Sequence, residues 1–153
     1  MKLSKILTTA VVALGATMFF ASSCEETIFE KDGDWDPIEL DKTHVNFPPE
    51  GGQNTVSALN YSRWWISGGY EIIRIADQKI DSDYIHATSS DGEDACTYDI
   101  LDGGWYHVTV PDKGKSNTII ITVDPLSGDR LPRETIIKMQ AGDAFTQISI
   151  AQQ

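Results

Sequence analysis

The chain has 153 residues and a formal net charge of −11 at pH 7, with 23 acidic against 12 basic side chains. This balance argues against nucleic acid as a partner, because phosphates are bound through Lys and Arg. It also disfavours electrostatic attachment to anionic lipid headgroups. Once the N-terminal segments are set aside, the length suffices for one hydrophobic core and not for two.

The N-terminal residues 1–23 have the layout of a secretory signal peptide. A positively charged start with Lys2 and Lys5 precedes an apolar run and then small residues. The apolar run is shorter than the ~20 residues that a membrane-spanning helix needs. Cys24 follows directly, and this arrangement resembles a bacterial lipoprotein box, in which the Cys receives a diacylglyceryl group and becomes the new N-terminus. We therefore expect lipidation at Cys24 and anchoring by acyl chains, the alternative being a soluble secreted protein with an unmodified Cys.

Residues 24–37 are expected to form a short, disordered tether that carries the lipid. The segment is rich in acids and poor in apolar residues, so it cannot bury enough surface to order itself. The pair Glu25-Glu26 resembles the acidic tag that sends many Bacteroidetes lipoproteins to the outer cell surface. The sequence therefore predicts an outer membrane lipoprotein exposed at the cell surface, and it leaves a periplasmic orientation open.

Residues 38–153 are expected to form one all-β domain. No segment shows helical spacing of apolar residues over a dozen positions. Short β-rich runs bounded by Gly, Pro, Asp and Ser recur instead, which is typical of an antiparallel sandwich. The strands that we expect are Glu39–Asp41 with His44–Phe47, Asn54–Leu59, Trp64–Ser67, Tyr70–Ala76, Tyr84–Ala87, Ala95–Ile100, Tyr106–Val110, Thr118–Asp124, Thr135–Gln140 and Phe145–Ala151.

Adjacent tryptophans allow side chains to be assigned to the two faces of a strand. Successive side chains in a strand point to opposite faces. Trp64 shares parity with the apolar Ile66, so we assign Trp64 to the core and Trp65 to the outer face. On a later strand Tyr106 begins an apolar row, which leaves Trp105 on the opposite face.

Glycines predict two further features. The apolar parity changes across Gly68-Gly69, which indicates a β-bulge. The sequence Ala141-Gly142-Asp143-Ala144 predicts a hairpin between the last two strands, with Ile148 and Ile150 on one face of the second of them.

The order and spacing of several short motifs resemble the BACON domain (Bacteroidetes-associated carbohydrate-binding, often N-terminal). They are Phe47 with Glu50-Gly51-Gly52, Thr55-Val56, Trp64 with Ile66, Gly104-Trp105, Thr118–Val123, Arg133 with Ile136, and Ile150-Ala151-Gln152. The resemblance implies an Ig-like β-sandwich of the kind found in surface lipoproteins and beside glycoside hydrolases. It implies a carbohydrate-binding role, although some members of the family act as spacers. The segment 68–103 is longer than the usual link, and the Asn common before the Arg is not evident in 124–131.

The sequence offers little for catalysis, and we expect no enzyme, no cofactor and no metal site. His44, His86 and His107 have no neighbouring Cys or His at metal-ligand spacing, and no nucleophile-elbow motif is present. Carboxylates are abundant in the polar loops, but a glycosidase needs two of them across a cleft, one with a raised pKa.

The aromatic side chains are the better indication of function. Sugar rings present an apolar C–H face that stacks on exposed indoles and phenols. We expect Trp65 and Trp105 to share an exposed platform, with Tyr70 or Tyr84 beside it and acids of the 77–94 loop, and to bind a polysaccharide or glycoprotein glycan. The alternatives are that both tryptophans are structural, or that the chain is a spacer or a protein-interaction subunit of an outer-membrane polysaccharide-uptake complex. In that last case exposed strand edges would pair with a partner.

Overall fold

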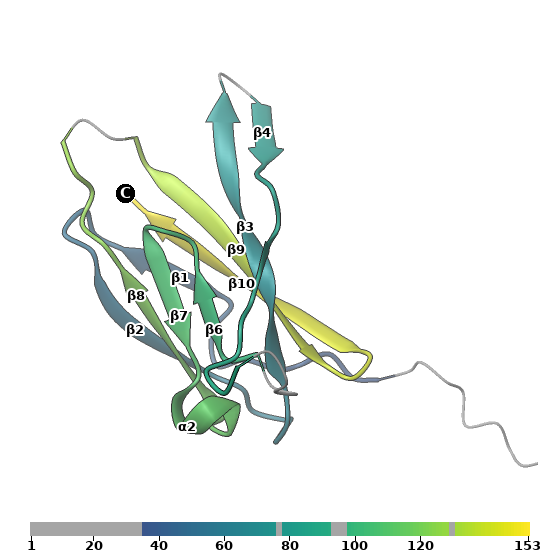
Figure 1. Ribbon diagram of the computed structural model, residues 1–153. Coiled ribbons are helices and arrows are strands. Elements are labelled where there is room, and N and C mark those ends of the chain that lie inside the picture. The colour runs from purple at the N-terminus through teal and green to yellow at the C-terminus, as the bar shows by residue number, and fades with distance from the viewer. Residues whose placement is uncertain (1–34, 76–77, 93–97, 129–130) are drawn as a thin grey trace, which may run out of the picture. The chain divides into compact units, whose positions relative to one another are not determined.

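The computed structural model describes residues 35–75, 78–92, 98–128 and 131–153, and Trp35–Gln153 forms one compact unit. Two β-sheets pack face to face (Figure 1). The first sheet has the order β1-β10-β9-β3-β4, with β5 also paired to β3, and the second has the order β2-β8-β7-β6. The strands are β1 (His44–Phe47), β2 (Gly52–Ser57), β3 (Trp65–Ile75), β4 (Gln78–Asp81), β5 (Ile85–His86), β6 (Ile100–Asp102), β7 (Tyr106–Thr109), β8 (Thr118–Val123), β9 (Arg133–Ala141) and β10 (Ala144–Gln152).

The core lies between the sheets and is made by alternate residues of the strands. Ile66, Val108 and Ile121 are fully buried, as are Ile137 and Ile148. Because the apolar side chains alternate with polar ones along β9 and β10, a shift of one residue in register would turn this row to solvent. The hydrophobic pattern therefore fixes which face of each strand is the inner one.

The edge strand β1 pairs with β10 in parallel, with His44 opposite Ser149 and Phe47 opposite Gln152. The other strand pairs of both sheets are antiparallel among the described residues. The expected antiparallel sandwich therefore has one parallel pair among its described strands, at this edge. Parallel pairing arises because β1 and β2 belong to different sheets, so β1 enters the first sheet without a hairpin partner.

Several expected strands differ from those observed. The runs predicted as Trp64–Ser67 and Tyr70–Ala76 form one strand, β3, with a bulge between Ile66 and Gly68. Glu39–Asp41 forms no strand and contributes only an isolated antiparallel bridge between Leu40 and Ala58. The strand expected over Ala95–Ile100 begins at Ile100 as β6, and residues 95–97 lie outside the described part of the chain.

Two elements were not expected from the sequence. The strand β4 pairs with the far end of β3, and all four of its residues are exposed, so it carries no buried alternation. The other is α2 (Pro111–Gly114), a single turn in which Asp112 and Lys113 have φ of 54° and 57°. No helix among the described residues is long and apolar enough to cross a membrane.

A buried amide ties the loops together at one end of the sandwich. Gln152 is fully buried, and its Nε2 donates to the carbonyl oxygens of Pro48 at 3.0 Å and Asp124 at 2.9 Å. Its Oε1 accepts from Arg133 Nε at 2.8 Å, and Arg133 Nη2 donates to the Asp124 carbonyl at 2.8 Å. This network satisfies loop backbone groups that the two sheets leave unpaired.

Candidate functional site: an aromatic groove on the outer face of one sheet

The outer face of the first sheet carries a row of large side chains near the start of β3. Trp65 on β3 lies opposite Gln140 on β9, which in turn lies opposite Phe145 on β10. Residues opposed in this way are close enough for their side chains to touch. Trp64 and Ile66 are buried at 4% and 0% exposure, whereas Trp65 is half-buried and Phe145 is exposed. The assignment of Trp64 to the core and Trp65 to the outer face is therefore confirmed.

Gly68 makes room on this face for the ring of Tyr84. In the next row, Gly68 lies opposite Lys138, which lies opposite Gln147. A Cβ atom at Gly68 would lie 2.7 Å from Cε1 of Tyr84 and 2.2 Å from the carbonyl oxygen of Ile85. A side chain at position 68 would therefore displace both the ring and β5, which explains the glycine at the bulge.

Together these side chains line two hollows that share Ser67, Tyr84 and Gln140. One hollow, of about 520 Å³, continues over Lys138, Phe145 and Gln147, and the other, of about 440 Å³, continues over Trp65, His86 and Tyr98. We call their combined lining the aromatic groove, and it consists of Trp65, Ser67, Tyr84, His86, Ala87, Tyr98, Lys138, Met139, Gln140, Phe145, Thr146 and Gln147. Its open, shallow form and its mixture of ring faces and amides suit a flat polar ligand better than an enclosed apolar one.

Neighbouring contacts hold the groove's polar groups in place. The amide of Gln140 accepts from Ser67 Oγ at 3.4 Å and donates to the Gly142 carbonyl at 2.9 Å. The Tyr84 ring packs edge-on against His86, with centroids 5.0 Å apart. Burial raises the pKa of the Tyr84 hydroxyl, so this phenol stays a neutral hydrogen-bond donor at physiological pH.

The four predicted ligand-binding aromatics do not gather at one place. Trp65 and Tyr84 line the same hollow. Tyr70 lies farther along β3 on the same face, beneath the Lys138 ammonium, whose Nζ is 5.5 Å from the ring centroid. Trp105 is elsewhere, so the expected platform shared by Trp65 and Trp105 is wrong.

Trp105 is held by contacts with Glu71, farther along β3, and with Arg133. Its Nε1 donates to Glu71 Oε1 at 2.8 Å, and the guanidinium carbon of Arg133 lies 4.4 Å from its ring centroid. Glu71 is six residues beyond Trp65 on β3, which corresponds to roughly 20 Å along a strand. These contacts engage both the indole N–H and one ring face, so Trp105 covers the end of the sandwich.

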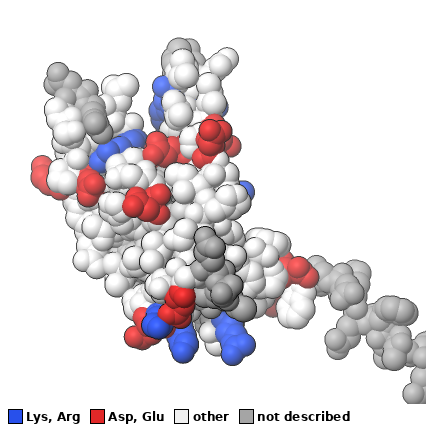
Figure 2. Space-filling view, viewed as in Figure 1, with Lys and Arg blue, Asp and Glu red and all other residues white. Residues whose placement is uncertain are grey.

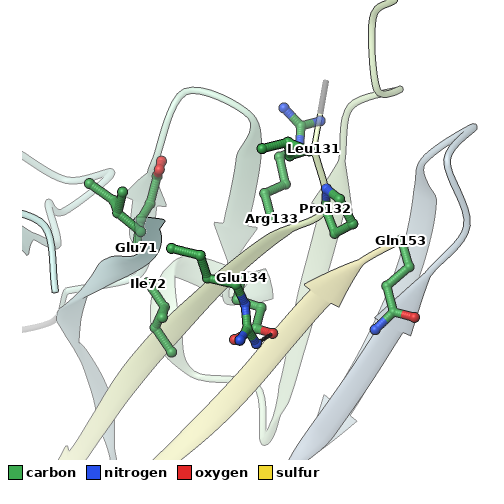
Figure 3. A pocket seen from close by; sticks show the side chains of 9 residues that line it. Glu71, Ile72, Leu131, Pro132, Arg133, Glu134 and Gln153 are labelled. Atoms are coloured by element: carbon green, nitrogen blue, oxygen red, sulfur yellow. Dashed lines mark hydrogen bonds and ion pairs between the residues drawn. The ribbon is translucent and has the colours of Figure 1, made fainter. Parts of the chain in front are cut away.

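Another hollow, which we call the terminal cleft, is lined in part by Glu71 and Arg133, the residues that contact Trp105. It has a volume of about 590 Å³ and is lined by Glu71, Ile72, Ile73, Arg74, Leu131, Pro132, Arg133, Glu134 and Gln153. Figure 3 shows Glu71 and Ile72 on β3 facing the segment that leads into β9, which carries Leu131 and Pro132. Glu134 pairs with Arg74 and, at 3.4 Å, with Lys79. Acidic and basic side chains lie close together around this cleft (Figure 2), so its charges largely compensate one another.

The described residues offer no site for metal chemistry. None of them form a group of three or more His, Cys, Asp or Glu side chains that could hold a metal ion. His107 lies between two carboxylates, with Nδ1 3.2 Å from Asp102 and Nε2 3.7 Å from Asp124, and all three side chains are substantially exposed. Cys24, the expected lipidation site, lies outside the described residues, as do Glu93 and Asp94 of the 77–94 loop.

Acids of the 77–94 loop were expected to assist the aromatics, but the described ones do not line the groove. Asp91 instead pairs with Lys113 Nζ at 2.6 Å. The sequence reasoning also missed Phe145, Tyr98 and Lys138. Phe145 carried a usable signal, because it follows the turn at Gly142 and has the parity opposite to Ile148.

Comparisons with known proteins establish the fold. A protein from Bacteroides thetaiotaomicron, solved by NMR, matches with a TM-score of 0.53 and 22% identity, over 80% of this chain and 92% of that one. Two more distant matches are the ASH/PapD-like domain of human CEP192 and murine CRIg. The first has a TM-score of 0.38 and 12% identity over 76% of this chain and 83% of that one. The second has a TM-score of 0.33 and 10% identity over 76% of this chain and 94% of that one. No protein-family profile and no curated protein matches the chain. The strand order and the first of these matches show that the domain is an all-β sandwich of two sheets.

Proposed function

We propose that this chain is a non-catalytic, lipid-anchored module of the bacterial cell surface that binds glycans through the aromatic groove. The observation that carries this proposal is the row of ring faces from Trp65, Tyr84 and Phe145 beside the amides of Gln140 and Gln147. The order of motifs that resembles the BACON domain supports the same function, and we propose membership of that family.

The chemistry of the groove fits a sugar chain. Aromatic faces stack on the C–H face of a pyranose, while amides and hydroxyls exchange hydrogen bonds with its hydroxyl groups. Phe145 is 58% exposed and Tyr84 is 40% exposed. Exposed aromatic surface of this kind lowers the solubility of a chain unless a ligand covers it, so several such rings in one hollow favour a binding role.

The direct test is calorimetry or affinity electrophoresis against plant and host polysaccharides. We expect Trp65→Ala to weaken binding by about tenfold or more, because loss of one stacked ring removes roughly 1–2 kcal/mol. The matched control is Trp35→Ala, since Trp35 is 60% exposed and does not line the groove. Equal retention of Trp65→Ala and the unaltered protein on every polysaccharide that binds would contradict the assignment of the groove.

The proposed lipid anchor is tested separately from the ligand. Labelled palmitate supplied to cells should enter the unaltered protein and should not enter Cys24→Ser. Protease treatment of intact cells then distinguishes an outward-facing domain, which is cleaved, from a periplasmic one, which is protected. Absence of label in the unaltered protein would exclude the anchor without bearing on the groove.

A second candidate function is suggested by the far end of β3. The last pair between β3 and β9 is Ile72 with Glu134, yet β3 continues to Ile75 with β4 on its other side (Figure 1). Ile73, Ile75 and Ile80 are 44%, 59% and 43% exposed there. An extended segment of a partner protein, such as a subunit of a polysaccharide-uptake complex, would fit this open edge by β-augmentation.

A photo-crosslinking residue at position 75 in living cells tests this second function. Adducts that disappear when Arg74→Pro blocks the strand edge would support it. The control position is Leu59, which is 62% exposed and lies outside this hairpin. Equal adduct formation at both positions would argue against a partner at β3.

A further inference from the structure

The aromatic groove differs in charge from the protein that surrounds it. The chain has 23 acidic and 12 basic residues. None of the described residues that line the two hollows is acidic, and the Lys138 side chain brings a positive charge to one of them. A cation with no acid in the same lining, within a strongly acidic chain, favours ligands of the opposite sign.

Lys138 makes no salt bridge among the described residues, whereas Lys79 pairs with Glu134 and Lys113 pairs with Asp91. The Lys138 side chain lines one hollow of the groove, and its ammonium lies over the Tyr70 ring, with Nζ 5.5 Å from the centroid. A cation placed over a ring and beside aromatic stacking surfaces is available to an incoming anion.

We propose that the groove selects sugars that carry a carboxylate. The sugar ring stacks on Tyr84 and Trp65, and its carboxylate accepts a charge-assisted hydrogen bond from Lys138 Nζ. Gln147, which lies opposite Lys138 on β10, supplies an amide donor beside it. This inference rests on the proposed glycan-binding function and adds the chemical class of the ligand.

Calorimetry with matched polymers tests the inference. The probes are polygalacturonate and its fully methyl-esterified form, which differ in the carboxylate alone, together with hyaluronan, and with sialyllactose against its methyl ester. We expect the acid form of at least one pair to bind about tenfold more tightly than its neutral counterpart, as one charge-assisted hydrogen bond predicts. A response to the uronate polymers identifies a uronate ligand, and a response to sialyllactose alone identifies a terminal sialic acid.

Variants assign the effect to one side chain. Lys138→Gln should lower the affinity for the acidic sugar by about tenfold and so remove most of the difference in affinity between the acidic sugar and its neutral counterpart. Lys79→Gln lowers the net charge equally but lies on β4 outside the groove, and it should bind as the unaltered protein does. Binding that is equally tight for acid and neutral forms, or equal losses in the two variants, would overturn this inference while leaving the proposed function intact. Failure of every sugar to bind would overturn both.

Discussion

Replacing Gln152 with Leu tests whether the buried amide network determines the stability of the sandwich. Leu has a similar volume, so the change leaves little cavity and removes mainly the polar contacts. The amide of Gln152 makes three short hydrogen bonds, to the Pro48 carbonyl, the Asp124 carbonyl and Arg133 Nε, with distances between 2.8 and 3.0 Å. Each such bond contributes about 1 kcal/mol. Both carbonyls keep a second donor, the Gly51 N–H for Pro48 at 3.0 Å and Arg133 Nη2 for Asp124 at 2.8 Å, so the variant leaves neither of them without a partner.

We therefore expect Gln152→Leu to lower the free energy of unfolding by about 3 kcal/mol and the melting temperature by roughly 10 °C. Urea unfolding followed by tryptophan fluorescence measures this loss. The neighbouring Gln153 is exposed and provides a matched control, since Gln153→Leu should change stability by less than about 0.5 kcal/mol.

Gln152→Glu separates the two halves of the amide. A carboxylate can still accept from Arg133, but it cannot donate to the loop carbonyls and places negative charge beside them. It should be at least as destabilising as the Leu variant. A loss below about 1 kcal/mol for Gln152→Leu would refute the reasoning, because the loops would then be held without the amide.

Two further changes address single groups. The Tyr106 hydroxyl is fully buried with no hydrogen-bond partner of good geometry among the described residues, and burial raises its pKa. Tyr106→Phe should therefore unfold at the same or a slightly higher urea concentration. A decrease of more than about 1 kcal/mol in the free energy of unfolding would show that the hydroxyl is hydrogen-bonded. The hydrogen bond from Arg74 holds the pKa of Glu134 below its ordinary value. The ionised Glu134 therefore stabilises the fold at pH values above the unfolded-state pKa of this carboxyl, and this stabilisation is lost as the pH falls through its folded-state pKa. Stability measured from about pH 7 to pH 3 should fall less in Glu134→Gln than in the unaltered protein, by under about 1 kcal/mol because the pair is partly exposed, and parallel curves would contradict this.

The parts of the fold that the sequence predicted correctly are those with strong alternation. The parity of Trp64, Trp65 and Ile66 placed each side chain on the correct face, because the core selects one face of a strand. The hairpin between β9 and β10 was also predicted, since its two-residue turn at Gly142-Asp143 joins two alternating strands. By contrast, β4 has no buried residue, so its pairing leaves no hydrophobic pattern to detect.

The candidate site was predicted only in part, because parity assigns a face but not a position along the sheet. Trp65 begins β3, whereas Trp105 lies just before β7 of the other sheet and contacts Glu71, six residues farther along β3. The contribution of Phe145 depends on its register with Gln140 across the hairpin. The room for Tyr84 depends on Gly68, and such contacts between distant segments cannot be read from local spacing.

The parallel pairing of β1 with β10 has a mechanical consequence. The chain enters β1 at His44, opposite Ser149, and it leaves β10 at Gln152, opposite Phe47, so it enters and leaves this strand pair at opposite ends. Tension applied between the two termini of the domain therefore slides these strands past one another, so the backbone bonds that join them are loaded together and not one after another. The domain should resist extension best when it is pulled along this direction.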